Sequence, residues 1–232
     1  DRVLFTCDSF GAHYCSSEMF SEFNDKYTET FKYYFDVIMK PFSRFMQRAV
    51  ERIRPLEIDF ICPGHGPIHH KNFNTALDLS EKYSNDYLKL TFGNDHYNIL
   101  IACVSAYGYT LQAAEIIAAG ILENREIKVE IIDIENITSD DLESKLITAE
   151  GILIGSPTIN QNTLLPVYKL FALINPLRDK GKLGGAFGSY GWSGESPKII
   201  LETLRLLKLK IFEQNGSFKF SPGGEKEEIL KD

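Results

Sequence analysis

Three loops rich in glycine, serine and threonine stand out in the second half of the chain, because each directly follows an apolar segment of strand length. They are Ser105–Thr110, Gly155–Asn160 and Gly188–Glu195. Backbone N–H groups and hydroxyls in such a turn can converge on a phosphate, and the positive end of the helix that follows adds to the attraction. A hydroxyl-rich turn taken alone is also a common helix cap.

The second and third loops add groups that suit a flat heterocycle. Tyr190 and Trp192 lie between glycines, where they can stack on a ring, although packing at a surface edge is the simpler explanation for each one alone. We predict that Ser105 and Thr110 bind a phosphate while Tyr190 and Trp192 border the ring. The candidate binding residues are Ser105, Ala106, Tyr107, Gly108, Tyr109, Thr110, Pro157, Thr158, Ile159, Asn160, Ser189, Tyr190, Gly191, Trp192 and Gly194.

A second pair of chemically capable residues lies in the first half. Asp8 follows the short apolar segment Val3–Phe5, and His65 lies in the turn Pro63-Gly64-His65-Gly66-Pro67. Carboxylate and imidazole are both good iron ligands. Taken alone, they are more simply a capping carboxylate and a turn histidine. His13, His69, His70 and His96 match no ligand pattern and are expected at the surface or behind the ligands.

The segments around the three loops predict an α/β fold for residues 95–232. Buried strands alternate with amphipathic helices, and this alternation is typical of a doubly wound parallel sheet. One helix places Leu111, Ala114, Ala118 and Ile121 on one face. We expect five strands in the order 2-1-3-4-5, with the loops at the carboxyl ends of strands one, three and four, where ligands bind such sheets. The expected strands are Asn98–Val104, Ile127–Ile134, Gly151–Ile154, Leu183–Phe187 and Lys210–Phe220, the last with the turn signal Asn215-Gly216.

Residues 1–94 have a different pattern. Two short strands, at Val3–Phe5 and Asp59–Cys62, accompany a long helical stretch and a last helix near Asn74–Leu90. Pro41 should kink or divide the long stretch. Its predicted apolar stripe is Phe31, Tyr34, Phe35, Ile38, Phe42, Phe45, Ala49 and Ile53. Two strands and three helices do not make a credible domain alone, so we expect this half to be part of a larger one.

Charge and cysteine content exclude several classes of protein. The net charge of −7 argues against a protein that binds nucleic acid or an anionic membrane surface. No apolar run is long enough to span a membrane, and no secretion signal opens the chain. Four cysteines without a CxxC spacing predict buried thiols in a reducing compartment, hence a cytoplasmic protein.

The motifs together resemble the flavodiiron family. GSPTIN, GSYGWSGE and the first loop are similar to its FMN-binding loops, while PGHGP and the segment Leu4–Gly11 are similar to its later metal-ligand loops. The resemblance implies that residues 1–94 are the C-terminal portion of a metallo-β-lactamase-like αββα domain and residues 95–232 a flavodoxin-like domain. It implies FMN and two iron ions as cofactors. It also implies a rubredoxin-like or flavin-reductase electron donor, a head-to-tail homodimer, and reduction of dioxygen to water or nitric oxide to nitrous oxide.

Carried over residue by residue, the resemblance assigns two metal ligands. Asp8 matches the carboxylate that bridges the irons, and His65 matches the last histidine ligand, so both should line one pocket. The family's H-x-E-x-D-H cluster has no counterpart in this sequence. We therefore expect a C-terminal fragment with an incomplete iron site, whose missing half of the metal domain belongs to a second chain or was lost by truncation. The fragment should be active only when that half is present.

Two other functions remain open at this stage. One is an FMN-binding electron carrier without reductase activity of its own. The other is a zinc hydrolase, since metallo-β-lactamase folds mostly cleave esters and amides. An FMN domain has no role in hydrolysis, and Ser9-Phe10-Gly11 after Asp8 matches the flavodiiron branch, which disfavours the hydrolase.

Overall fold

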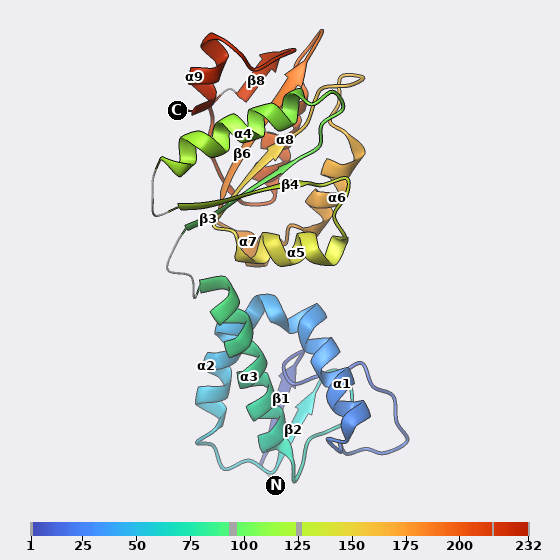
Figure 1. Cartoon of the computed structure of the whole chain (residues 1–232). Helices are drawn as coiled ribbons and strands as arrows, with labels where there is room; N and C mark the ends of the chain where they lie inside the picture. The colour runs from blue at the N-terminus through green and yellow to red at the C-terminus, as the bar shows by residue number, and fades with distance from the viewer. Residues whose placement is uncertain (1, 93–96, 124–126, 215, 232) are drawn as a thin grey trace. The chain divides into compact units, whose positions relative to one another are not determined.

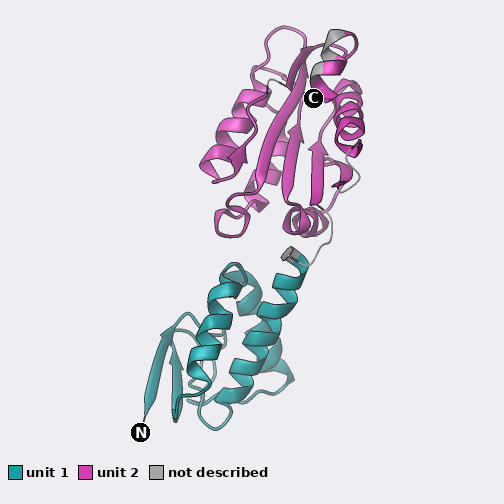
Figure 2. Cartoon of the chain, turned by 90° about the vertical axis from the view of Figure 1, so that its left-hand side faces the viewer, with its two compact units in different colours: residues 1–93 teal, residues 94–232 magenta. Residues whose placement is uncertain are grey.

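The chain divides into two compact units, residues 1–93 (unit 1) and residues 94–232 (unit 2), which Figure 2 shows in separate colours. The computed structural model describes residues 2–92, 97–123, 127–214 and 216–231. The domain boundary predicted between residues 94 and 95 lies outside these ranges. Each unit is described below by itself.

Unit 2 is built on one parallel sheet (Figure 1). Four strands follow the order β4-β3-β5-β6, and both β7 and β8 pair with the free edge of β6. The predicted α/β fold and the order 2-1-3-4-5 are confirmed, with the fifth position shared by two short strands. The strands are β3 (Tyr97–Cys103), β4 (Ile127–Asp133), β5 (Gly151–Gly155), β6 (Leu183–Tyr190), β7 (Lys210–Ile211) and β8 (Gly216–Lys219).

The break in the fifth strand differs from the single segment 210–220 that was predicted. Ile211 still pairs with Gly184, whereas pairing resumes only at Gly216, opposite Phe187. A Cβ at Gly216 would lie 2.5 Å from the carbonyl oxygen of Ala186, so only glycine lets β8 approach β6 this closely. Asn215 of the predicted turn lies outside the described residues.

Helices cover both faces of this sheet, as the alternating sequence predicts. Leu100 and Ala102 face one core with α5, α6 and α8, while Ile101 and Cys103 face the other with α4 and α9. Strands buried on both faces therefore need continuous apolar runs. The helices are α4 (Tyr109–Leu122), α5 (Ser139–Thr148), α6 (Leu165–Leu173), α7 (Pro176–Asp179), α8 (Ser196–Leu206) and α9 (Glu225–Lys231).

Helix α4 departs from its predicted buried face. Ala114 and Ala118 are buried as expected, but Leu111 is exposed, and Thr110 and Ala113 are buried in its place. Leu111 lies in the first turn, where the helix reaches the edge of the sheet and only the side carrying Thr110 is covered. The helix α7 was not predicted at all.

Unit 1 contains a two-stranded parallel sheet and a helical layer. Within its described residues, β1 pairs in parallel with β2, and α2 packs against α3. The exposed side of β1 carries Val3 and Phe5, the latter 80% exposed. The elements are β1 (Val3–Cys7), α1 (Asp25–Tyr34), the π-helical turn η1 (Phe35–Met39), the 3₁₀ turn η2 (Lys40–Phe42), α2 (Ser43–Ile53), β2 (Phe60–Pro63) and α3 (Phe73–Phe92).

The division of the long helical stretch at Pro41 is confirmed, and it changes which residues are buried. The π and 3₁₀ turns do not have 3.6 residues per turn, so the apolar stripe continues at Met46 and Val50. Phe42 and Phe45 of the predicted stripe are instead exposed.

The prediction of buried thiols is only partly correct. Cys103 is buried, and burial with the nearby charges of Asp133 and Glu115 raises the pKa of its thiol to about 12. Cys7 and Cys15 are exposed, because β1 presents Cys7 on its uncovered side and Cys15 lies in the loop before α1. Among the helices that are described, none has the length and apolarity needed to cross a membrane.

Candidate functional site

The three predicted loops begin side by side at one edge of the unit 2 sheet. Cys103 of β3 is level with Gly155 of β5, which is level with Phe187 of β6. The Val104 N–H donates to the Gly155 carbonyl at 2.9 Å, and the pairing of β5 with β6 extends into the loops. Parallel pairing in this register brings the carboxyl ends of strands one, three and four together, as the sequence predicts.

Ser189 connects the three loops. Its hydroxyl lies 3.1 Å from the hydroxyl of Thr110 in the first loop. Its carbonyl accepts the Thr158 N–H of the second loop at 2.9 Å. The Thr158 hydroxyl in turn accepts the N–H of Ser196, the first residue of α8, at 3.1 Å. Thr110 and Ser189 are buried, so their hydroxyls hold the loops together at the base of the site.

The first loop presents backbone donors. Gly108 has a left-handed conformation (φ 83°) directly before α4, and a Cβ there would meet no atom within 4 Å. The Ser105 hydroxyl accepts the N–H of Leu111 at 3.4 Å. Within the described part of the chain, the N–H groups of residues 106–110 have no protein acceptor. Free N–H groups at a helix start are suited to an anion such as phosphate.

The second loop is a tight turn whose shape comes from two left-handed residues. Asn160 and Gln161 have φ of 54° and 57°, and Ile159 and Asn162 exchange both backbone hydrogen bonds at 3.1 Å. The Asn162 side chain accepts the Tyr168 hydroxyl at 2.8 Å. The same side-chain oxygen accepts the N–H of Thr163 at 2.8 Å, so Asn162, which was not among the predicted residues, holds the end of the turn.

The third loop carries the most exposed aromatic side chain of the site. Trp192 is 98% exposed, and Tyr107 of the first loop is also well exposed. A Cβ at Gly194 would lie 2.9 Å from the Tyr190 ring, so glycine is required where that ring lies. A groove of about 650 Å³ opens beside Tyr190 and Trp192 and continues along α8. Exposed aromatics beside a polar loop cluster offer a surface for a planar ring.

Three buried polar atoms on or next to the second and third loops have no hydrogen-bond partner among the described residues: Thr163 Oγ1, Glu195 Oε2 and Ser196 Oγ. Buried polar atoms in native proteins are nearly always paired. The free N–H groups of the first loop fit a bound anion. The predicted FMN residues are therefore gathered in one place, and their individual contacts with FMN stay predictions.

The predicted approach of Asp8 and His65 in unit 1 is confirmed. Asp8 Oδ1 lies 3.3 Å from His65 Nε2, and both side chains are about half exposed, at 54% and 53%. The parallel pairing of β1 and β2 ends both strands at the same edge. The Gly64 N–H then donates to the Cys7 carbonyl at 2.6 Å, and the Ala12 N–H donates to the His65 carbonyl at 3.1 Å.

The Asp8–His65 pair is not a complete metal site. Across the described ranges of both units, no three His, Cys, Asp or Glu side chains are close enough to hold a metal ion. His13 lies nearby, with its ring 6.2 Å from that of His65 and 4.7 Å from that of Tyr34. Burial, and then the charges of Asp8 and Cys7, raise the pKa of Tyr34. One carboxylate and one imidazole suit iron chemically, but two ligands do not enclose a diiron centre.

The other histidines separate into two kinds. His69 is completely buried, which rules out the surface and agrees with the other expected place, behind the ligand loops. His70 is half-buried and stacks on Phe60 with ring centres 4.4 Å apart. His96 lies outside the described residues. The residue pattern does not distinguish these two histidines, because they are neighbours in one turn.

Comparison with known proteins covers both units. Residues 101–231 match the family model described as Flavodoxin. The chain is 36% identical over 222 residues to the type A flavoprotein fprA of Rhodobacter capsulatus, covering 96% of this chain and 51% of that protein. It is 34% identical over 226 residues to the flavo-diiron protein FprA2 of Clostridium acetobutylicum, covering 96% of this chain and 56% of that one.

A solved structure is also similar to nearly the whole chain. The rubredoxin oxygen:oxidoreductase of the anaerobe Desulfovibrio gigas is similar over 99% of this chain and 57% of its own, with a TM-score of 0.60 and 26% identity. The chain thus spans about half the length of the curated relatives it matches.

Proposed function

Since the chain belongs to the flavodoxin family and to the FMN-binding oxidoreductases known as flavodiiron or type A flavoproteins, we propose that unit 2 holds FMN at its three loops. The observation that carries the proposal is the connection of all three loops through Ser189, next to the free N–H groups of the first loop. Bound FMN supplies one- and two-electron transfer.

The residues of the loops have separate tasks in this proposal. The N–H groups of residues 106–110 and the Ser105 hydroxyl bind the phosphate. Thr110 and Ser189 hold the first loop against the third, since their hydroxyls bond each other and are buried. Tyr107, Tyr190 and Trp192 border the ring system and exclude water from it.

We extend the proposal to the whole protein of which the relatives are examples. Unit 1 is then the C-terminal part of a metallo-β-lactamase-like domain, and Asp8 and His65 are two ligands of a diiron centre. Electrons enter from a rubredoxin-like or flavin-reductase donor, and a head-to-tail homodimer brings each flavin to its partner's metal site. The substrate is dioxygen or nitric oxide. The name of the Desulfovibrio gigas protein, rubredoxin oxygen:oxidoreductase, supports the donor and the oxygen substrate.

A second candidate function is an FMN-binding electron carrier without reductase activity. It is favoured by the presence of only two candidate ligands among the described residues of unit 1. Iron content and oxygen consumption separate the two functions, because only the first requires both.

The test of FMN binding is direct. The purified chain should be yellow, and denaturation should release one FMN per chain. Adding FMN to flavin-free protein should quench flavin fluorescence with a one-to-one endpoint. A colourless protein that leaves the fluorescence of added FMN unchanged would refute the proposal.

A further inference from the structure

Two strained residues flank Asp8 in unit 1. Cys7 and Phe10 have left-handed backbone conformations, with φ of 51° and 65°. A residue with a side chain rarely adopts this conformation, and a bulky phenylalanine least of all. Such strain persists only where the surroundings enforce it, and it concentrates where a side chain must be held in place. The loop that carries Asp8 is therefore held by something outside itself.

Phe10 is held at both its side chain and its backbone. Its ring is 2% exposed within the aromatic core of unit 1. Its carbonyl oxygen lies 2.8 Å from Nε2 of His69. A carbonyl can only accept, so Nε2 of His69 carries the proton and donates it.

His69 is itself fixed by its neighbours. It is 0% exposed, and its Nδ1 lies 2.8 Å from the Ser21 hydroxyl, whose oxygen also lies 3.2 Å from Oδ1 of Asn72. Its backbone exchanges two hydrogen bonds with Ile61 of β2, each 2.9 Å long. The Phe23 ring stacks on the imidazole with centres 5.6 Å apart. Burial lowers the pKa of His69, which favours the neutral ring with its proton on Nε2, facing the Phe10 carbonyl.

His69 connects the two loops that carry Asp8 and His65. His69 lies at the base of the loop that carries His65, while its side chain bonds the loop that carries Asp8. We propose that His69 is a positioning residue, which locks the strained Asp8 loop onto the His65 loop and so sets the Asp8–His65 geometry. The inference rests on the proposed function only in assigning those two residues to metal binding.

The test uses backbone amide exchange in the full chain. The reporters are the Ala12 and Gly64 N–H groups, whose hydrogen bonds join the two loops. His69→Leu keeps a similar volume but removes the donor, and His69→Gln returns an amide N–H near the same place. We expect His69→Leu to accelerate exchange at Ala12 and Gly64 at least about tenfold relative to α3 amides, and His69→Gln to restore most of the protection.

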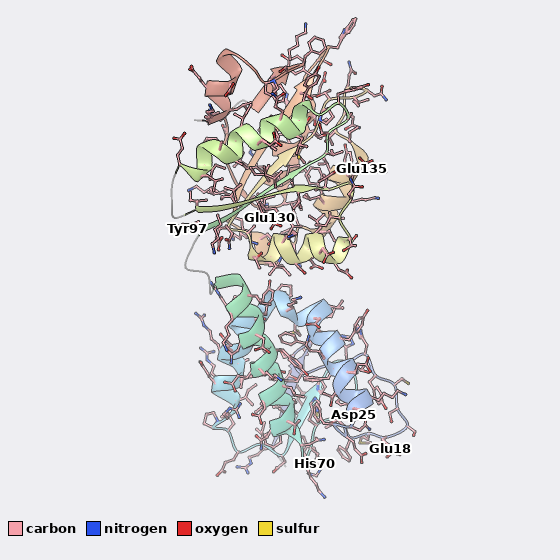
Figure 3. The ribbon with its side chains drawn as sticks, in the orientation of Figure 1. Glu18, Asp25, His70, Tyr97, Glu130 and Glu135 are labelled. Atoms are coloured by element: carbon pink, nitrogen blue, oxygen red, sulfur yellow. The ribbon has the colours of Figure 1, made fainter. Side chains whose placement is uncertain are left out.

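The matched control is the neighbouring histidine. His70, labelled in Figure 3, stacks on Phe60 and lies at the half-buried surface, so His70→Leu should leave both reporters unchanged. A uniform acceleration of all unit 1 amides in His69→Leu, or no change at the reporters, would overturn the proposal. If His69→Leu does not fold, Ser21→Ala removes the partner of Nδ1 and should accelerate the same two amides to a smaller extent.

A second measurement separates this inference from the proposed metal role. Substoichiometric Mn²⁺ should broaden the NMR signals of Asp8 and His65 in the natural chain, and His69→Leu should reduce the broadening severalfold. Equal broadening in both chains would count against His69 as a positioning residue. If Mn²⁺ broadens neither signal in the natural chain, the metal role of the pair fails, and the exchange data alone decide the positioning role.

Discussion

Both units place their candidate site at the carboxyl ends of parallel strands, but only one of them encloses it. Unit 2 joins three loops through buried hydroxyls, because its sheet is wide and covered on both faces. Unit 1 joins two loops from a two-stranded sheet, and its Asp8–His65 pair remains about half exposed. The candidate site of unit 2 is thus built from three loops that bond one another, and that of unit 1 from two.

In unit 2, we expect the largest effect from a substitution at the point where the backbones of the second and third loops are in contact. A Cβ at Gly188 would lie 2.0 Å from the carbonyl oxygen of Ser156. We expect Gly188→Ala to separate the second and third loops, to lower the free energy of unfolding by about 3 kcal/mol or more, and to abolish FMN binding. Urea unfolding and FMN titration measure both effects.

A matched glycine controls this prediction. A Cβ added at Gly223 would have its nearest neighbour, the Ser221 hydroxyl, at 3.8 Å. Gly223→Ala should therefore change the free energy of unfolding by no more than about 0.5 kcal/mol. Full FMN binding by Gly188→Ala would show that the loops need not meet as they do here.

In unit 1, acid should lower the free energy of unfolding through His69, the buried residue behind the Asp8–His65 pair. His69 has a lowered pKa in the folded protein and an ordinary one near 6.5 when unfolded. Below about pH 6.5 the unfolded chain binds a proton at His69 that the folded chain does not. The free energy of unfolding therefore decreases as the pH is lowered, until the pH reaches the folded pKa of His69. The slope from this residue cannot exceed about 1.4 kcal/mol per pH unit.

The measurement is urea unfolding of unit 1 signals between pH 7 and pH 5, compared with His69→Gln. The variant should show a flatter profile in this range. An identical slope in both proteins would mean that another group titrates.

The hydroxyl pair between the loops allows a smaller test. Thr110→Val and Ser189→Ala each remove one side of a buried hydrogen bond. We expect each single change to weaken FMN binding and stability by about 1–2 kcal/mol, with a coupling of about 1 kcal/mol in the double-mutant cycle. Purely additive effects would show that the two hydroxyls do not act together.

The smallest effect on stability is expected at the rim of unit 2. Trp192 is 98% exposed, so Trp192→Ala should leave the free energy of unfolding within about 0.5 kcal/mol. FMN affinity should fall by about 0.5–1.5 kcal/mol if the indole borders the ring. Unchanged affinity would remove Trp192 from the site, while Trp192→Phe should retain most of the binding.

Local patterns were enough to predict most of unit 2. Its strands are continuous apolar runs because both faces are buried, and its loops carry glycine and hydroxyl residues because they turn into helices. These features are properties of short segments, so the strands and the three loops followed from the residues, whereas the order 2-1-3-4-5 is that of the flavodoxin-like fold which the resemblance implies. The break between β7 and β8 did not follow from short segments, since it depends on how closely Gly216 approaches β6.

Some features of the chain follow from short segments, and others depend on contacts between distant segments. The sequence by itself determined the alternation of strands and helices, the division at Pro41, and the two loops that bring Asp8 to His65. Only the tertiary structure decided that Met46 rather than Phe45 is buried, and that His69 rather than His70 lies in the core. The physical reason is that periodicity identifies an apolar face, whereas burial and hydrogen bonding depend on which segment, far away in the chain, covers that face.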